Sequence, residues 1–511
     1  MRGLYPCHRR PIVVGLLLLV PFALLLASAR LASAEDTPPT PPQPKDIELP
    51  LPEPSAEDAS SEPAFDLAGH WEGVIKLPGA DLQILLDFAR SEEGDWVGTM
   101  DSPMQSAKGV PITEIVINDD RVDFALSGVP GNPNFKGRAK GKRMEGDFTQ
   151  NGQTFPFSVG REALPKPKRP QEPKAPFPYR AEEITYKQGD ITFAGTLTIP
   201  EGTGPFPAAL LITGSGPQNR DEEIFGHKPF AVLADFLSRA GIAVLRVDDR
   251  GVGGTTGTSA TATTEDFAAD VLAGVAFLRA RPEVDRKKIG LIGHSEGGVI
   301  APLVASRSKD VAFIVMLAGT GVPGRDVLLK QTELVSRAEG VGEPLLQAEL
   351  AQLRVMLDLI VAGADTTAIG AKLAETASAL LATAAESDKP GIEASAKSFR
   401  VQLNYMTSPW FRYFLTYDPR PALRNVKVPV LALNGERDLQ VPPEQNLPEI
   451  EKALKEAKNK DVTVTKLPGL NHLLQPAKVG AISEYAAIET TMDPSALETI
   501  RDWILRRFVR T

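Results

Sequence analysis

The stretch that decides the fold is Ile289-Gly290-Leu291-Ile292-Gly293-His294-Ser295-Glu296-Gly297-Gly298, an apolar run that passes directly into Gly-x-Ser-x-Gly. A helical segment follows over 297–306. A serine at such a strand–turn–helix junction is typical of a nucleophile elbow, where a strained turn holds the hydroxyl clear of the sheet. The flanking glycines are needed because the two backbones pass too closely for a Cβ. Ser295 is therefore predicted to be a nucleophile, and a tight structural turn is the alternative.

Working outward from this stretch, apolar runs alternate with helical segments from residue 179 onward. The runs lie at 208–213, 242–248, 289–292, 313–318, 430–433 and 462–467, and the helical segments at 228–240, 265–280, 297–306 and 495–508. Continuous apolar runs are expected of strands that a parallel sheet buries on both faces. The alternation predicts an α/β fold with a mainly parallel sheet over 179–511.

The alternation stops between about 323 and 424, where the chain is helical in pattern. Leucines and one isoleucine recur at spacings of four and three, which gives a single apolar stripe: Leu346, Leu350, Leu353, Leu357 and Ile360. A helical insertion over the carboxyl edge of a sheet predicts a lid.

A serine nucleophile needs a general base, and the chain offers five histidines. His8 and His70 lie outside the α/β region, and the side chain of His294 is expected to point away from its neighbour's hydroxyl. His227 comes too early for the usual order of serine, acid and histidine. His472, in the loop after the last predicted strand, is the predicted base; a loop or helix-cap histidine is the alternative.

The orienting acid is expected in the loop after the 430–433 strand, between the serine and the histidine. That loop contains Gly-x-x-Asp-x-x-Val-Pro, which resembles the acid loop of many α/β-hydrolases. Asp438 is the predicted acid and Glu436 the second choice. The alternative is a surface carboxylate paired with Arg437.

Two backbone N–H groups are needed to stabilise the oxyanion. One is expected from Glu296, the residue after the nucleophile. The other is expected from the small residues after the first core strand, either Gly214 or Ser215. A glycine-rich turn without this role remains the alternative.

Three further runs carry a family resemblance. GSGPQNRDEE at 214–223, RVDDRGVGGTTG at 246–257 and GHSEGG at 293–298, with Asp438 and His472, resemble bacterial α/β-hydrolase carboxylesterases over 180–511. The resemblance implies a serine hydrolase that cleaves small-molecule esters of short to medium acyl chains through an acyl-enzyme. It calls for no cofactor and no metal.

Four charged residues of the shared pattern are expected to brace the site rather than react: Arg220, Asp221, Asp249 and Arg250. The same constellation also serves aminopeptidases and other amide or lactone hydrolases, so these stay open. A different class of protein, a non-catalytic binder of an envelope ligand, is the remaining alternative. The oligomeric state is left open.

The N-terminal part is predicted to contain an export signal and two linkers. Residues 1–34 combine arginines, an apolar run and Ala32-Ser33-Ala34, which predicts a signal peptide and a periplasmic or extracellular protein. If the segment stayed uncleaved, it would anchor the chain in a membrane. Residues 35–63 form a Pro-rich acidic linker and 164–178 a second Pro-rich linker, expected to be a solvated spacer.

Residues 64–163 show short alternating runs separated by turn signals, including Asn118-Asp119-Asp120 and Asn151-Gly152. The expected strands lie at 71–75, 82–88, 96–98, 115–117, 122–124 and 155–157. This spacing predicts an antiparallel sheet or small barrel. Trp71 and Trp96 are expected in its core.

Composition excludes several classes of protein. The 511 residues carry a net charge of −9, with no long basic block in the body of the chain, so nucleic-acid binding is not expected. Cys7 is the only cysteine, which excludes an internal disulfide and cysteine-based metal sites.

Overall fold

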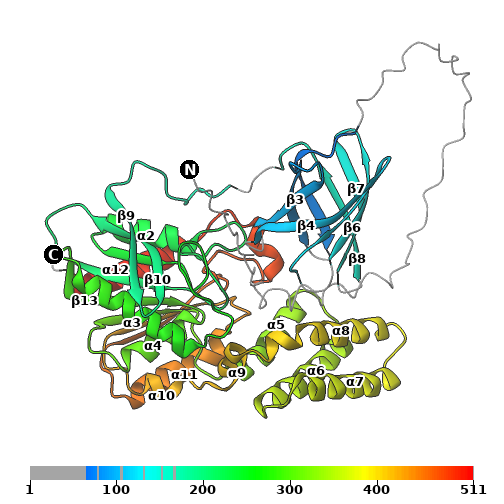
Figure 1. Ribbon diagram of the computed structural model, residues 1–511. Coiled ribbons are helices and arrows are strands. Elements are labelled where there is room, and N and C mark those ends of the chain that lie inside the picture. Colours follow the sequence, from blue (N-terminus) through cyan, green and yellow to red (C-terminus); the bar gives the residue numbers. More distant parts are fainter. Residues whose placement is uncertain are drawn as a thin grey trace, which may run out of the picture. The chain divides into compact units, whose positions relative to one another are not determined.

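A computed structural model describes residues 65–77, 80–103, 107–129, 133–150, 153–164 and 168–509. They form two compact units: a barrel unit that ends at Leu164 and a C-terminal unit over 168–509 (Figure 1). The predicted signal peptide, the first linker and the turn at Asn151-Gly152 lie outside the described residues. No helix among the described residues is long and apolar enough to cross a membrane.

The barrel unit is a closed barrel of antiparallel strands in sequence order. Its strands are β1 (Gly69–Leu77), β2 (Ala80–Arg90), β3 (Trp96–Ser102), β4 (Ala107–Asn118), β5 (Arg121–Leu126), β6 (Asn134–Lys140), β7 (Arg143–Gln150) and β8 (Gln153–Gly160). The prediction of a small antiparallel barrel is confirmed. β6 and β7 were not predicted, because small residues such as Gly137 and Ala139 alternate inward between charged ones.

Aromatic rings fill the barrel. Phe135 is fully buried, stacks on Phe124 at 4.5 Å between ring centroids, and meets Phe157 edge-on at 5.0 Å. Trp71 is fully buried, as predicted. Trp96 is not part of the core: it is half-exposed, and the Arg90 guanidinium lies 4.0 Å above its ring. The period-2 pattern marks a strand without showing which face each residue takes.

The C-terminal unit is built on an eight-stranded sheet with the order β16-β15-β14-β13-β11-β12-β10-β9. Its strands are β9 (Tyr179–Gln188), β10 (Ile191–Pro200), β11 (Phe206–Ile212), β12 (Ala243–Val247), β13 (Val284–His294), β14 (Phe313–Leu317), β15 (Val430–Gly435) and β16 (Val462–Leu467). β11 to β16 run parallel, and β10 pairs antiparallel with both β9 and β12. The predicted α/β fold with a mainly parallel sheet is confirmed.

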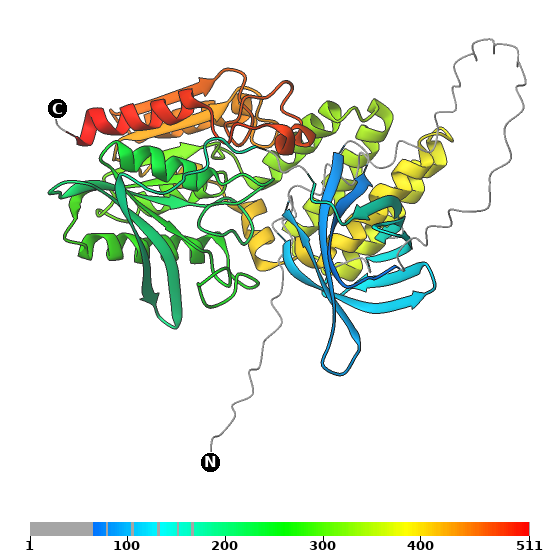
Figure 2. The ribbon, with the colours of Figure 1, turned by 90° about the horizontal axis from the view of Figure 1, so that it is seen from above.

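Helices cover both faces of this sheet (Figures 1 and 2). One face carries α3 (Thr264–Ala280), α4 (Gly297–Ala305), α10 (Arg420–Leu423) and α11 (Pro443–Glu456). The other carries α2 (Pro229–Arg239) and α12 (Pro494–Phe508). The four predicted helices are found; α11 was not predicted, because Pro448 interrupts a mostly polar segment.

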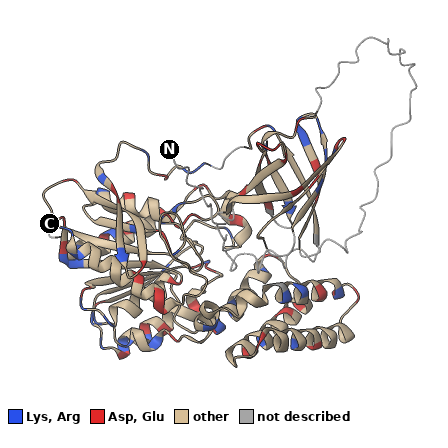
Figure 3. Ribbon diagram, viewed as in Figure 1, with Lys and Arg blue, Asp and Glu red and all other residues tan. Residues whose placement is uncertain are grey.

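The insertion between β14 and β15 is helical, as predicted. It contains α5 (Gly324–Ala338), α6 (Glu343–Val361), α7 (Thr366–Thr383), α8 (Lys389–Met406) and α9 (Pro409–Thr416). The predicted stripe on α6 is buried in two clusters. Leu353, Leu357 and Ile360 pack with Ile369, Phe399 and Trp410. Leu346 and Leu350 pack with Val341. Basic and acidic positions are interspersed along α7 and α8 (Figure 3).

The second predicted linker does not run as a free spacer after residue 168. The Arg169 guanidinium donates to the carbonyl oxygens of four residues in two distant loops, at 3.0–3.1 Å: Phe225, Gly226, Ala486 and Ile488. Gln171 accepts from the Thr491 and Met492 N–H groups and donates to the Met492 carbonyl. We call residues 168–171 the strap, because they fasten to the C-terminal unit.

Candidate active site

Ser295 occupies the turn between β13 and α4. It has a φ of 53°, in the left-handed region that non-glycine residues rarely adopt. Every residue from Ile289 to Ala305 is buried except Ser295. The turn therefore presents this one side chain at the edge of an otherwise closed stretch.

The glycines around Ser295 are required by backbone contact. A Cβ on Gly293 would lie 1.9 Å from the Gly297 carbonyl oxygen, and one on Gly297 would lie 2.2 Å from the Ile212 carbonyl oxygen. These separations are far below van der Waals contact. The strand and the helix thus pass too closely for a side chain at either of these glycines, as Gly-x-Ser-x-Gly predicts.

His472 and Asp438 form a buried pair. The His472 Nδ1–H donates to Asp438 Oδ2 at 2.8 Å, and the Asp438 side chain is fully buried. The other oxygen, Oδ1, accepts the N–H groups of Gln440 and Val441, both at 2.8 Å. The carboxylate is thus fixed from one side and holds the imidazole with the other, which leaves Nε2 as the free acceptor.

The elbow and the His472 loop lie side by side. The ring centroids of His294 and His472 are 4.8 Å apart, and His294 Nε2 lies 3.0 Å from the His472 carbonyl oxygen. Because His294 directly precedes Ser295, this contact brings the predicted nucleophile and base to one place. Glu436, the second choice for the acid, instead accepts the Gly469 N–H and is exposed.

The loop after β11 lies against the elbow. An ideal Cβ on Gly214 would be 3.3 Å from the Ser295 Cβ. The Gly214 N–H donates to Glu222 Oε1 at 2.7 Å, so it already has a partner. Of the two residues predicted to supply the second oxyanion donor, Gly214 is therefore already engaged through its N–H.

The Glu296 side chain joins three elements at this point. Its buried carboxylate accepts from Thr264 Oγ1 of α3 at 2.7 Å, from Trp410 Nε1 of α9 at 2.9 Å and from the Ser215 hydroxyl. Burial raises the pKa of Glu296. The residue after the predicted nucleophile is thus hydrogen-bonded to Trp410 of the helical insertion.

A cavity of about 60 Å³ lies behind this loop. Gly214, Asp249 and Glu296 are among its lining residues, together with apolar side chains of the sheet and of α3 and the Arg250–Asp270 pair. Burial raises the pKa of Asp249 well above its usual value, and its carboxyl accepts from Thr213 Oγ1 and the Gln218 N–H. Hydrogen bonds hold the two carboxyl groups, Asp249 and Glu296, in place.

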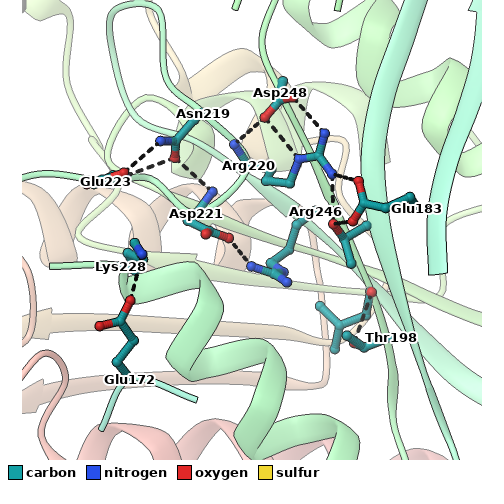
Figure 4. A network of polar contacts seen from close by, with 12 residues as sticks. Glu172, Glu183, Thr198, Asn219, Arg220, Asp221, Glu223, Lys228, Arg246 and Asp248 are labelled. Carbon is teal, nitrogen blue, oxygen red and sulfur yellow. Dashed lines mark hydrogen bonds and ion pairs between the residues drawn. The ribbon is translucent and has the colours of Figure 1, made fainter. Parts of the chain in front are cut away.

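Two charged residues of the shared pattern, Arg220 and Asp221, brace the loop (Figure 4). Arg220 donates to Asp248 and Glu183, and Asp221 pairs with Arg246. These contacts tie the loop to β9 and β12. Arg250 pairs with Asp270 of α3. Asp249 accepts from Thr213 and Gln218, so all four predicted bracing residues have partners in the fold, as expected of residues that brace a site.

Two histidines outside the pair have buried, structural settings. His227 Nε2 donates to the Tyr485 carbonyl and Nδ1 meets Thr491 Oγ1; burial, with Arg169 nearby, lowers its pKa to about 4. His294 binds Glu222 through Nδ1 at 2.9 Å. Sequence reasoning missed Glu222, Thr264 and Trp410. Only Glu222 lay within a recognised run, 214–223, as its ninth residue.

Comparisons with known proteins find a family match and a similar esterase. Residues 228–475 match the family described as serine aminopeptidase, S33. The chain is 35% identical over 167 residues to the esterase EstD of Thermotoga maritima; the match spans 32% of this chain and 40% of that protein.

Solved structures that resemble the chain include an esterase, Pf2001, of Pyrococcus furiosus, with 18% identity, a TM-score of 0.39, and coverage of 69% of this chain and 100% of that one. Another is Est1E of Butyrivibrio proteoclasticus with bound ferulic acid, with 16% identity, a TM-score of 0.36, and coverage of 63% and 98%. The strand order and the family match together give the C-terminal unit the α/β-hydrolase fold, preceded in this chain by an antiparallel barrel.

Proposed function

We propose that the chain is a serine hydrolase that cleaves carboxylic esters of small molecules, with Ser295, His472 and Asp438 as its catalytic residues. The observation that carries the proposal is the buried His472–Asp438 pair held beside the elbow that exposes Ser295. The partial likeness to EstD supports an ester as substrate.

In the proposed reaction Ser295 Oγ attacks the ester carbonyl, and His472 Nε2 takes the hydroxyl proton. Asp438 holds the imidazole in the tautomer that can accept it and stabilises the imidazolium. The Glu296 and Ser215 N–H groups stabilise the oxyanion. His472 then protonates the leaving alcohol and activates the water that hydrolyses the acyl-enzyme.

We further propose that helices α5–α9 act as a lid and that the chain works outside the cytoplasm. Trp410 supports the first proposal, since it connects α9 to the residue after the nucleophile. The export proposal rests on the sequence of residues 1–34.

The second candidate function is amide hydrolysis, which the matched aminopeptidase family favours. The same catalytic residues serve both reactions, and the leaving group decides between them.

The test uses purified wild type and Ser295→Ala. We expect a fluorophosphonate to label the wild type at Ser295, and p-nitrophenyl esters to be hydrolysed faster than aminoacyl-nitroanilides. Ser295→Ala should lose both the label and the turnover. Faster cleavage of nitroanilides would select the aminopeptidase instead, and the absence of label and turnover would leave a binding protein.

A further inference from the structure

The His294 imidazole lies between two groups that accept hydrogen bonds. Nδ1 is 2.9 Å from Glu222 Oε1, and Nε2 is 3.0 Å from the backbone carbonyl oxygen of His472. A carbonyl oxygen can only accept, and so can an ionised carboxylate. Both ring nitrogens must then carry a proton, which makes the ring an imidazolium.

The surroundings of this ring support a charged state. Its side chain and that of Glu222 are 9% and 4% exposed, so both groups are largely shielded from water. The titratable groups near the ring are Glu222, Asp438 and His472. Burial alone lowers the pKa of His294, but the charge and hydrogen bond of Glu222, together with the His472 carbonyl, raise it above its usual value.

The same contacts connect three loops. Glu222 Oε1 also accepts the Gly214 N–H at 2.7 Å, in the loop that carries Ser215. His294 is part of the elbow, and its second donor holds the backbone of the loop that carries His472. Glu222 adopts a φ of 51°, a strained value for a non-glycine residue.

We propose that His294 is a positioning residue, doubly protonated at neutral pH, whose ion pair with Glu222 fixes the Ser215 loop and the His472 loop against the elbow. The role rests on the proposed function, whereas the protonation state does not. The oxyanion is bound most strongly in the transition state, so disturbing these loops lowers kcat more than it raises KM.

His227 provides an internal comparison. It is also buried, at 1% exposed. Its Nε2 faces the Tyr485 carbonyl and its Nδ1 the Thr491 hydroxyl, with the Ile488 carbonyl and the Arg169 charge nearby. A hydroxyl can donate, so a neutral ring satisfies both contacts. The two buried histidines are therefore expected to differ in charge.

Ring ¹⁵N NMR of the full chain labelled at histidine tests the protonation state. Five histidines give few signals, and His294→Gln and His227→Gln assign the two buried ones. At pH 7 we expect His294 to show two protonated ring nitrogens and His227 one. One protonated nitrogen on His294 at pH 7 would overturn the proposal, whether or not the chain hydrolyses esters.

Glu222→Gln tests the positioning role while keeping an acceptor for Gly214. It should lower kcat by about 100-fold with KM nearly unchanged, the size of effect that follows from misplaced catalytic groups. It should also convert His294 to the singly protonated form.

Glu223→Gln is the matched control, because it removes the neighbouring charge of the same loop, whose carboxylate accepts from Asn219. Kinetics and His294 signals should stay as in the wild type. A normal kcat in Glu222→Gln, in a chain whose Ser295 still labels, would overturn the positioning role. Absent activity in the wild type would instead count against the proposed function.

Discussion

The Asp438 carboxylate divides its oxygens between two tasks. Oδ1 accepts the two backbone N–H groups of its own loop, and Oδ2 accepts the His472 Nδ1–H. The first task shapes the loop, and the second selects the histidine tautomer. A substitution that keeps the backbone hydrogen bonds of Oδ1 but changes the group facing His472 tests the catalytic role without disturbing the loop.

Asp438→Asn is such a substitution. We expect kcat for p-nitrophenyl esters to fall by roughly 10³- to 10⁴-fold, because an amide that donates to Nδ1 favours the wrong tautomer. The melting temperature should change little, since Oδ1 keeps both backbone donors. Glu436→Gln is the control and should retain full activity. A loss of less than tenfold in Asp438→Asn would show that Asp438 is not the acid.

For single residues, the sequence predicted catalytic roles only where a short motif or a position after a strand indicates them. Ser295 follows from its glycines, and His472 and Asp438 follow from their position after strands. Glu222, His294 and Trp410 could not be assigned roles. Their partners lie 8 to 178 residues away, and nothing in a local pattern shows which buried polar group a side chain meets.

Among the elements, α9 makes the most specific contact with the site. Trp410→Phe keeps an aromatic ring against Phe414 but removes the donor to Glu296. We expect a lower kcat/KM and a loss of roughly 1–3 kcal/mol in unfolding free energy, because a buried carboxylate loses a partner.

Tyr413→Phe is the matched variant on the same helix, since its hydroxyl donates to Glu265 rather than to the residue beside the nucleophile. It should leave kcat/KM unchanged. Equal effects of the two variants would remove the link between α9 and the elbow. Steady-state kinetics and urea unfolding measure both.

Glu349 on α6 predicts a pH dependence of stability. It is buried, Ser336 Oγ donates to it at 3.3 Å, and its Oε1 has no hydrogen-bond partner among the described residues. Burial raises its pKa from 4.5 to about 8. Between these values the unfolded chain releases a proton that the folded chain keeps, so this contribution to stability is lost as pH rises.

Glu349→Gln cannot ionise and should lose that dependence. Relative to the wild type, its free energy of unfolding should be higher at pH 8.5 than at pH 5 by roughly 3–4 kcal/mol, since each pH unit between the two pKa values contributes about 1.4 kcal/mol. Urea titrations at the two pH values measure the difference. Glu343→Gln, an exposed change on the same helix, should show none. A difference that is the same at both pH values would contradict the prediction.

The elements themselves were predicted where apolar residues run continuously or with a clear period. The parallel strands and four helices of the C-terminal unit satisfy that condition. β6, β7 and α11 do not. Small residues such as Gly137 and Gly146 interrupt the apolar positions of the two strands, and in α11 the buried Leu447, Ile450 and Leu454 stand among polar residues and Pro448. Burial there depends on closure of the barrel or on neighbouring helices, which a local window does not contain.

On the scale of the whole molecule, the strap is expected to stabilise the C-terminal unit through the hydrogen bonds of Arg169. Arg169→Ala leaves four carbonyl groups without their guanidinium donor. Since the chain has two compact units, calorimetry should show two transitions. We expect only the transition of the C-terminal unit to move down, with a loss of roughly 1–3 kcal/mol.

Lys174→Ala, an exposed change a few residues later, is the control and should move neither transition. A shift of both transitions in Arg169→Ala, or of neither, would show that the strap does not stabilise the unit it contacts. Its charge and prolines predicted a solvated spacer. The contacts of Arg169 with the Phe225 and Ala486 carbonyls could not be predicted, because these residues are distant from it in the sequence.

Closure of the barrel also has a consequence for how the heated protein fails. A cylinder whose last strand pairs with its first offers no unpaired backbone row to another molecule, whereas the open sheet of the C-terminal unit ends in β9 and β16. Turbidity on heating should therefore begin with the melting of the open sheet. The cylinder should refold on cooling when it is kept apart from that precipitate.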